Sequence, residues 1–100
     1  MITGATTVAA VIGSPVRHSL SPALMNTAFR ASGLDLVYTA FEVAPGAAPA
    51  ALAAMRTLGF AGMNVTMPHK QDVFEGVDEL DPAARALGAV NCVVPLADGR

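Results

Sequence analysis

Short apolar segments alternate with segments of helical spacing, and this alternation restricts the fold more than any other feature of the sequence. The apolar and β-branched segments predict strands at residues 8–12, 37–43, 60–65 and 89–96. Helices are predicted after Ser21-Pro22, over residues 50–58, after Pro68 and after Asp81-Pro82. Strand–helix–strand units with short connections build a mainly parallel sheet flanked by helices, so the predicted fold class is α/β.

Several residues mark where these elements begin and end. Ser21 is expected to cap the first helix, while Gly33 and Gly59 supply left-handed stops for the first two helices. Asp98-Gly99 after the last apolar segment is a hairpin signal that no return strand follows. We therefore expect one domain over residues 1–100 that ends in an incomplete β-hairpin.

Composition excludes several classes of protein. No apolar run reaches the roughly 18 residues that a membrane-spanning helix needs. The six basic residues are scattered singly, and the net charge is −2, so no basic stripe favours nucleic acid. The single cysteine excludes an internal disulfide and a thiolate metal cluster, which favours a reducing cytoplasm and predicts no metal site.

Polar residues gather where predicted strands end, which is where ligands bind in open α/β sheets. Two clusters, residues 13–22 and 64–70, follow the first and third strands, and Asn91 lies in the last one. Ser19 and Ser21 stand at a predicted helix N-terminus, which favours an anion because free N–H groups point outward there. The alternative is that Ser21 serves only as a helix cap.

Lys70 is the only lysine, and Pro68 restricts the backbone just before it. Such a lysine can transfer a proton or polarise a hydroxyl, although it can equally be a solvated surface charge. Thr66 either caps the following helix or binds ligand. Asn91 is expected to be a buried amide that must find partners.

The remaining reactive side chains are given structural roles at this stage. His18 is expected to bond to the backbone, and His69 to face solvent or to pack. Cys92 is expected to be a small buried residue, because no activating partner is evident. The sequence contains no G-x-G-x-x-G and no G-x-x-x-x-G-K-[ST], so it offers no familiar nucleotide-phosphate loop.

Three motifs resemble those of the shikimate dehydrogenase family, specifically its N-terminal substrate-binding domain. Ile12–Pro22 is similar to I-G-x-P-x-x-H-S-x-S-P, Asn64–Lys70 to N-V-T-x-P-x-K, and Gly88–Asn91 to G-A-V-N. The resemblance implies that Ser19 and Ser21 bind the shikimate carboxylate, with Thr66 nearby. It also implies that Lys70 is catalytic and that Asn91 bonds the ring hydroxyls.

The reaction implied by the resemblance is the NADP-linked interconversion of 3-dehydroshikimate and shikimate in aromatic amino-acid biosynthesis. The family's catalytic Asp and its NADP-binding domain would follow Arg100, so we expect the isolated chain to be inactive. Its unpaired last strand is expected to favour self-association, such as a homodimer. Two alternatives stay open: a relative that acts on quinate or an aminated shikimate, and a non-catalytic module that binds a small hydroxy-acid.

Overall fold

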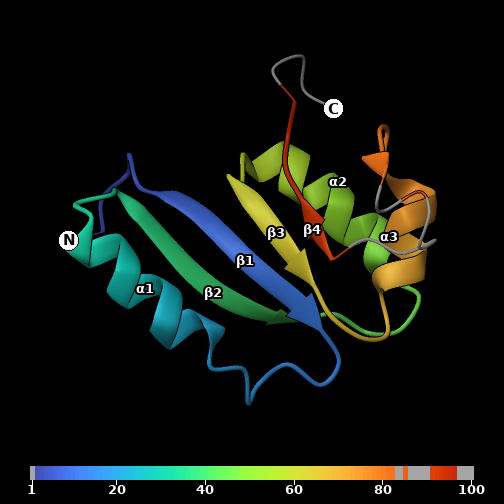
Figure 1. The fold of residues 1–100 in the computed structure, drawn as a ribbon, viewed down its shortest axis with the longest axis horizontal. Helices are drawn as coiled ribbons and strands as arrows, with labels where there is room; N and C mark the ends of the chain where they lie inside the picture. Colours follow the sequence, from blue (N-terminus) through green and yellow to red (C-terminus); the bar gives the residue numbers. More distant parts are fainter. Residues whose placement is uncertain (1, 83–84, 86–90, 97–100) are drawn as a thin grey trace.

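The computed structural model, which describes residues 2–82, 85 and 91–96, contains one four-stranded sheet with the order β2-β1-β3-β4 (Figure 1). Its strands are β1 (Thr7–Gly13), β2 (Leu36–Glu42), β3 (Gly62–Val65) and β4 (Cys92–Val93). β1 runs parallel to β2 and to β3, whereas β4 pairs antiparallel with β3. The predicted α/β class with a mainly parallel sheet is therefore confirmed.

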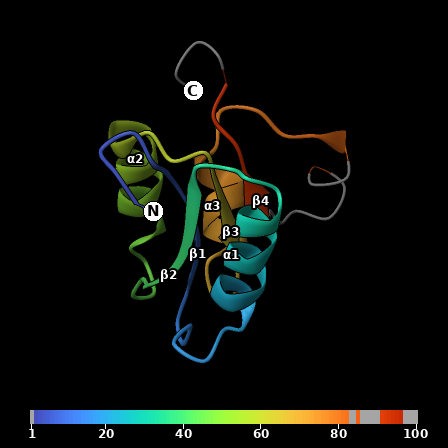
Figure 2. The ribbon, with the colours of Figure 1, turned by 90° about the vertical axis from the view of Figure 1, so that its left-hand side faces the viewer.

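Helices lie on both faces of this sheet, as the edge-on view in Figure 2 shows. The helices are α1 (Ser21–Ala31), α2 (Ala48–Leu58) and α3 (Lys70–Gly76). β1 is the central strand, and Ala10, Val11 and Ile12 are buried in succession along it. Because successive side chains of a strand point to opposite faces, this run requires cover on both sides.

The two faces carry different cores. On one face, Ala10 and Ile12 of β1 join residues of β3, α2 and α3 in the larger cluster, which consists of Ala10, Ile12, Ala48, Leu52, Met55, Met63, Val65 and Val73. On the other face, Val11, Val16 and Tyr38 form a smaller cluster against Met25 and Phe29 of α1. All eight residues of the larger cluster are apolar, whereas the smaller cluster includes Tyr38, which carries a hydroxyl.

An asparagine of α1 closes the open edge of β2. The side-chain amide of Asn26 donates from Nδ2 to the Tyr38 carbonyl at 2.8 Å, and its Oδ1 accepts from the Tyr38 N–H at 2.8 Å. The main-chain groups of Asp35 and Val43 bond to β1. Because these groups alternate in direction along a strand, those of Tyr38 face the opposite edge. Asn26 thus supplies the bonds that a neighbouring strand would make.

Most predicted boundaries are confirmed to within two residues, including the start of α3 at Lys70 after Pro68, whereas the cap of α1 and the extent of the last strand are wrong. Ser21 does not cap α1: the cap position is Leu20, and no side chain caps it. Of the described residues in the predicted strand 89–96, which are 91–96, only Cys92–Val93 form a strand, and residues 89 and 90 lie outside the described residues.

The glycine stops follow the prediction, since Gly33 and Gly59 have φ of 68° and 71°. The Arg85 N–H donates to the Asp81 carbonyl at 3.0 Å, which is one turn of the predicted helix after Asp81-Pro82. Its predicted end at Gly88 and the hairpin signal Asp98-Gly99 lie outside the described residues. Within the described part of the chain, no helix is both long and apolar enough to cross a membrane.

We predict that Asn26→Ala lowers the free energy of unfolding by about 1–3 kcal/mol, because it leaves a buried N–H and a buried carbonyl of Tyr38 unpaired. Urea unfolding of the chain measures this loss. The matched control is Thr27→Ala, whose hydroxyl bonds only to a carbonyl of its own helix on an exposed face. Equal midpoints for the two variants would show that the edge bonds contribute nothing.

Candidate functional site

The loops that follow β1 and β3 are joined at the carboxyl end of β1. The Thr66 N–H donates to the Ile12 carbonyl at 3.0 Å, and the Ser14 N–H donates to the Met67 carbonyl at 3.0 Å. β1 and β3 are parallel, so both loops leave the sheet at the same edge (Figure 1). The structure therefore brings together the backbones of the two polar clusters that are far apart in the sequence.

Gly13 permits this close approach. A Cβ atom at position 13 would overlap Cγ2 of Thr66 and would lie 3.4 Å from the Met67 carbonyl oxygen. Thr66 is half-buried, and its Cγ2 methyl group lies directly over the glycine. A β-branched side chain has few rotamers to choose from, so the position of its hydroxyl depends on this contact.

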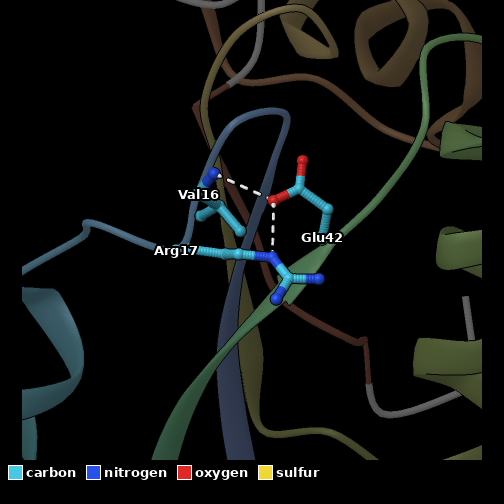
Figure 3. Close-up of polar contacts among 3 residues, drawn as sticks. All are labelled: Val16, Arg17 and Glu42. Carbon is cyan, nitrogen blue, oxygen red and sulfur yellow. Dashed lines mark hydrogen bonds and ion pairs between the residues drawn. The ribbon is translucent and has the colours of Figure 1, made fainter.

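The loop after β1 is also tied to the end of β2, as Figure 3 shows. Oε1 of Glu42 accepts a hydrogen bond from the Val16 N–H at 3.3 Å and lies 3.8 Å from Nε of Arg17. The Arg17 side chain is 84% exposed, so this ion pair contributes little to stability. The bond to the buried Val16 is the one that fixes the loop, and with it the start of α1.

Ser19 and Ser21 stand at the entry to α1, and both are half-buried. The Ser19 N–H donates to the Val16 carbonyl at 3.0 Å, and Oγ of Ser19 accepts from the Ser21 N–H at 3.2 Å. Ser19, rather than Ser21, thus satisfies a free N–H of the helix start. Within the described residues no hydrogen bond engages the Ser21 hydroxyl, and the Ser19 O–H remains a donor.

Thr66 and Lys70 are linked by a tight turn. The His69 N–H donates to the Thr66 carbonyl at 3.1 Å, and Lys70 is the first residue of α3. Its side chain is exposed, as expected for a group that meets a ligand or for a solvated charge. The turn fixes the lysine backbone relative to Thr66 and hence relative to the end of β1.

Asn64 contacts a residue that the sequence did not single out. Its Nδ2 donates to the hydroxyl oxygen of Tyr38 at 2.6 Å, reaching from β3 across β1 to β2. Register explains the contact, since Asn64 pairs with Val11, and Val11 and Tyr38 share one cluster. Sequence spacing carries no signal for it, because the partners lie on different strands.

Two expectations about the last strand are wrong. Asn91 was expected to be a buried amide, and Cys92 a buried small residue, but both are exposed. The Asn91 carbonyl accepts a bond from the Val65 N–H at 2.9 Å, which places the residue beside the end of β3. Exposure leaves the Asn91 amide accessible, next to the residue that precedes Thr66.

His69 is fully buried, which decides between its two predicted environments in favour of packing. Its Nε2 lies 2.6 Å from the carbonyl oxygen of Val43, just beyond β2. His18, in contrast, is exposed. Nothing in the local sequence distinguishes the two histidines, because the burial of His69 depends on a residue 26 positions away.

Among the described residues, those of the candidate site belong neither to a group that could hold a metal ion nor to the cavity beside α2. Among the described residues, no three His, Cys, Asp or Glu side chains are grouped so that they could hold a metal ion. A cavity of about 350 Å³ lies between α2, the segment after α3 and β4, and is lined by Leu52, Met55 and Val93 among others. It includes none of Ser19, Ser21, Thr66, Lys70 or Asn91, so it is separate from the candidate site.

The arrangement has a defined chemical capacity. One loop offers hydroxyl donors beside helix N–H groups, which suits a carboxylate. The other offers a threonine hydroxyl and the start of a helix that carries an ammonium group. A small molecule with a carboxylate at one end and hydroxyls at the other matches this pairing.

Comparison with known proteins points in one direction. Residues 11–93 match the model of the shikimate dehydrogenase substrate binding domain. The NADP(+) shikimate dehydrogenase of Moorella thermoacetica is 50% identical over 93 residues, which is 93% of this chain and 32% of that protein. The chain therefore spans about a third of the length of such relatives.

Solved structures agree with the sequence match. Shikimate 5-dehydrogenase from Listeria monocytogenes, in complex with shikimate and NAD, superposes with a TM-score of 0.93 at 45% identity, over 98% of this chain and 34% of that one. The Thermus thermophilus enzyme in complex with NADP(H) and shikimate gives 0.88 at 38% identity, over 95% and 36%.

We predict that Gly13→Ala destabilises the chain by about 1–3 kcal/mol, because the new methyl group overlaps Thr66 at a packed crossing. Thermal or urea unfolding measures the loss, and the amide signal of Thr66 in an ¹⁵N spectrum should shift. Gly4→Ala is the matched control, since a Cβ there meets nothing within 4 Å. If both variants unfold alike, Gly13 is not required for the crossing.

Proposed function

Because this chain belongs to the shikimate dehydrogenase substrate-binding domain family, we propose that it binds shikimate and 3-dehydroshikimate as the substrate side of an NADP-linked oxidoreductase. The observation that carries the proposal is the junction at Gly13. There the loop after β1, which carries Ser19 (the serine loop), meets the loop after β3, which leads to Lys70 (the lysine loop). A carboxylate donor set and an ammonium group on two joined loops fit opposite ends of one hydroxylated acid.

In this proposal, Ser19 and Ser21 hold the carboxylate. Both hydroxyls stand at the N-terminus of α1, an 11-residue helix whose free N–H groups and dipole favour an anion. The bond from the Ser21 N–H to Oγ of Ser19 orients the Ser19 hydroxyl, leaving its proton free to donate. This bond supports the assignment of the two residues to one anion site.

Lys70 is proposed as the catalytic residue beside the hydroxyl that is oxidised. An ammonium group there stabilises charge on the oxygen, and its amine form accepts the hydroxyl proton. Thr66 lies between the two ends of the ligand, and the exposed Asn91 amide bonds ring hydroxyls. We regard Asn64 and His18 as supports, which for Asn64 accords with its bond to Tyr38.

NADP supplies the hydride acceptor or donor in this reaction. The sequence has no glycine-rich G-x-G-x-x-G turn to receive a pyrophosphate, so the residues of this chain do not themselves fit the cofactor. The proposal therefore assigns residues 1–100 to substrate binding and places NADP on the remaining two-thirds of a protein of the relatives' length. A cytoplasmic setting and self-association through the strand edge stay predictions.

The carboxylate site alone does not decide which substrate of the family this chain prefers. A quinate or aminated-shikimate dehydrogenase would share the carboxylate site, and a binding module would share it without turnover. Assays of this chain joined to the rest of the Moorella enzyme, with shikimate and quinate as substrates, separate these possibilities.

We predict that the isolated chain binds shikimate with at best millimolar affinity and without turnover. Titration of ¹⁵N-labelled chain should shift the amide signals near Ser19, Thr66 and Asn91. Ser19→Ala should weaken binding by about 1.5–3 kcal/mol, because it removes a bond to a charged group. Ser21→Ala should also weaken binding, but without a loss of helix stability, since Ser21 is not the cap.

Two controls make this titration specific. Ser32→Ala alters a serine at the other end of α1 and should leave affinity unchanged. The methyl ester of shikimate lacks the negative charge, so Ser19→Ala should have little effect on its binding. Equal losses for the acid and the ester would contradict the carboxylate assignment.

We predict that Lys70→Ala lowers kcat by about 100-fold or more in a chimera that joins this chain to the remainder of the Moorella enzyme. Thermal stability should hardly change, because the lysine is exposed. Near-normal kcat in Lys70→Ala would end the assignment of Lys70 as catalytic. Arg56→Ala, which breaks an ion pair with Asp78 instead, is the control for loss of a cation.

A further inference from the structure

His69 is the one described polar or charged side chain that is fully buried. It lies in a loop whose neighbours on both sides, Pro68 and Lys70, are exposed. Loop residues ordinarily lie on the surface, because buried polar atoms need partners. A specific interaction must therefore hold this imidazole inside the protein.

That interaction is a bond to the main chain beyond β2. Nε2 of His69 lies 2.6 Å from the Val43 carbonyl oxygen, and a carbonyl can only accept. The ring therefore carries a proton on Nε2. Nδ1 is buried and has no hydrogen-bond partner among the described residues. The hydrogen bond to Val43 thus requires a proton on Nε2 of the ring.

Val43 connects this bond to the end of β1. The Val43 N–H donates to the Gly13 carbonyl at 3.0 Å, while its own carbonyl accepts from His69. On the other side, the His69 carbonyl accepts from the Val73 N–H at 2.9 Å inside α3. A continuous series of bonds therefore runs from the Gly13 junction through Val43 and His69 into the first turn of α3, where Lys70 lies.

We propose that His69 is a positioning residue for Lys70. Its Nε2–H bond fixes the start of α3 against the ends of β1 and β2, and so fixes the lysine backbone relative to the serine loop. Any effect of His69 on catalysis rests on the proposed role of Lys70, whereas its effect on the position of the Lys70 backbone does not. The contrary view is that the ring only fills space in the core.

Substitutions at position 69 distinguish the hydrogen bond to Val43 from the space that the imidazole ring fills. Glutamine places an amide nitrogen at the same bond separation from Cα as Nε2, so His69→Gln can restore the donor. Asparagine places its amide where Nδ1 lies, which is too short to reach Val43. Phenylalanine keeps an aromatic ring but has no donor. A positioning role predicts that Gln differs from Asn and Phe, whereas space filling predicts that Phe is the best substitute.

The single lysine provides a direct readout. Chain grown with ¹⁵N-lysine gives one backbone amide signal, that of Lys70. Because every variant changes the residue before Lys70, the signal position is compared after correction for that neighbour effect. We expect His69→Gln to keep the corrected position near that of the wild type, and His69→Asn and His69→Phe to shift or broaden the signal. A sharp signal with an unmoved corrected position in both of the latter variants would overturn the proposal.

A measurement on the unaltered chain guards against variants that fail to fold. In ¹⁵N-histidine-labelled chain, ring spectra should show one histidine as a fixed Nε2–H tautomer with slow proton exchange, and His18→Gln should remove the other set of signals. A ring that carries no proton on Nε2 would contradict the bond to Val43 and with it the proposal.

Kinetics of the chimera then test the catalytic consequence. His69→Asn should lower kcat about tenfold with KM for shikimate within about twofold, because geometry at the reacting hydroxyl is lost. His69→Gln should recover most of kcat. If Lys70→Ala is inactive while His69→Asn is fully active, the positioning role of His69 is wrong and the proposed function stands. If Lys70→Ala stays active, the proposed function fails instead, and the lysine amide signal still decides the structural claim.

Discussion

The close approach of the neighbouring ends of β1 and β3 at Gly13 is the constraint on which the rest of the site depends. Two main-chain bonds join the loops there, and only the absence of a side chain at position 13 leaves room for Thr66. Val43 adds a third segment by bonding to Gly13. Residues that are remote in sequence thus become neighbours through backbone geometry, before any side-chain chemistry is considered.

The two faces of the sheet carry cores of different size and polarity. The face of α2 and α3 holds the larger, apolar cluster, whereas the face of α1 includes the Tyr38 hydroxyl and its bond from Asn64. Asn26 and Glu42 serve the second face by closing a strand edge and holding a loop.

Features set by local sequence were predictable, and features set by distant partners were not. The strands, the glycine stops at Gly33 and Gly59, and the polar clusters at strand ends follow from spacing and backbone preference alone. The short β4, the exposure of Asn91 and the burial of His69 depend on contacts between segments. Ser21 failed as a cap because the chain enters α1 one residue earlier, which propensity does not resolve. The roles of Ser19, Ser21, Thr66, Lys70 and Asn91 rest on family resemblance and stay to be tested.

A crystal structure of this chain with shikimate tests the central claim most directly, because that claim concerns one ligand held by two joined loops. The account predicts the carboxylate between the hydroxyls of Ser19 and Ser21, with the ring extending over Thr66 and a hydroxyl facing Lys70. Shikimate bound to one loop alone, or in the separate cavity beside α2, would contradict it.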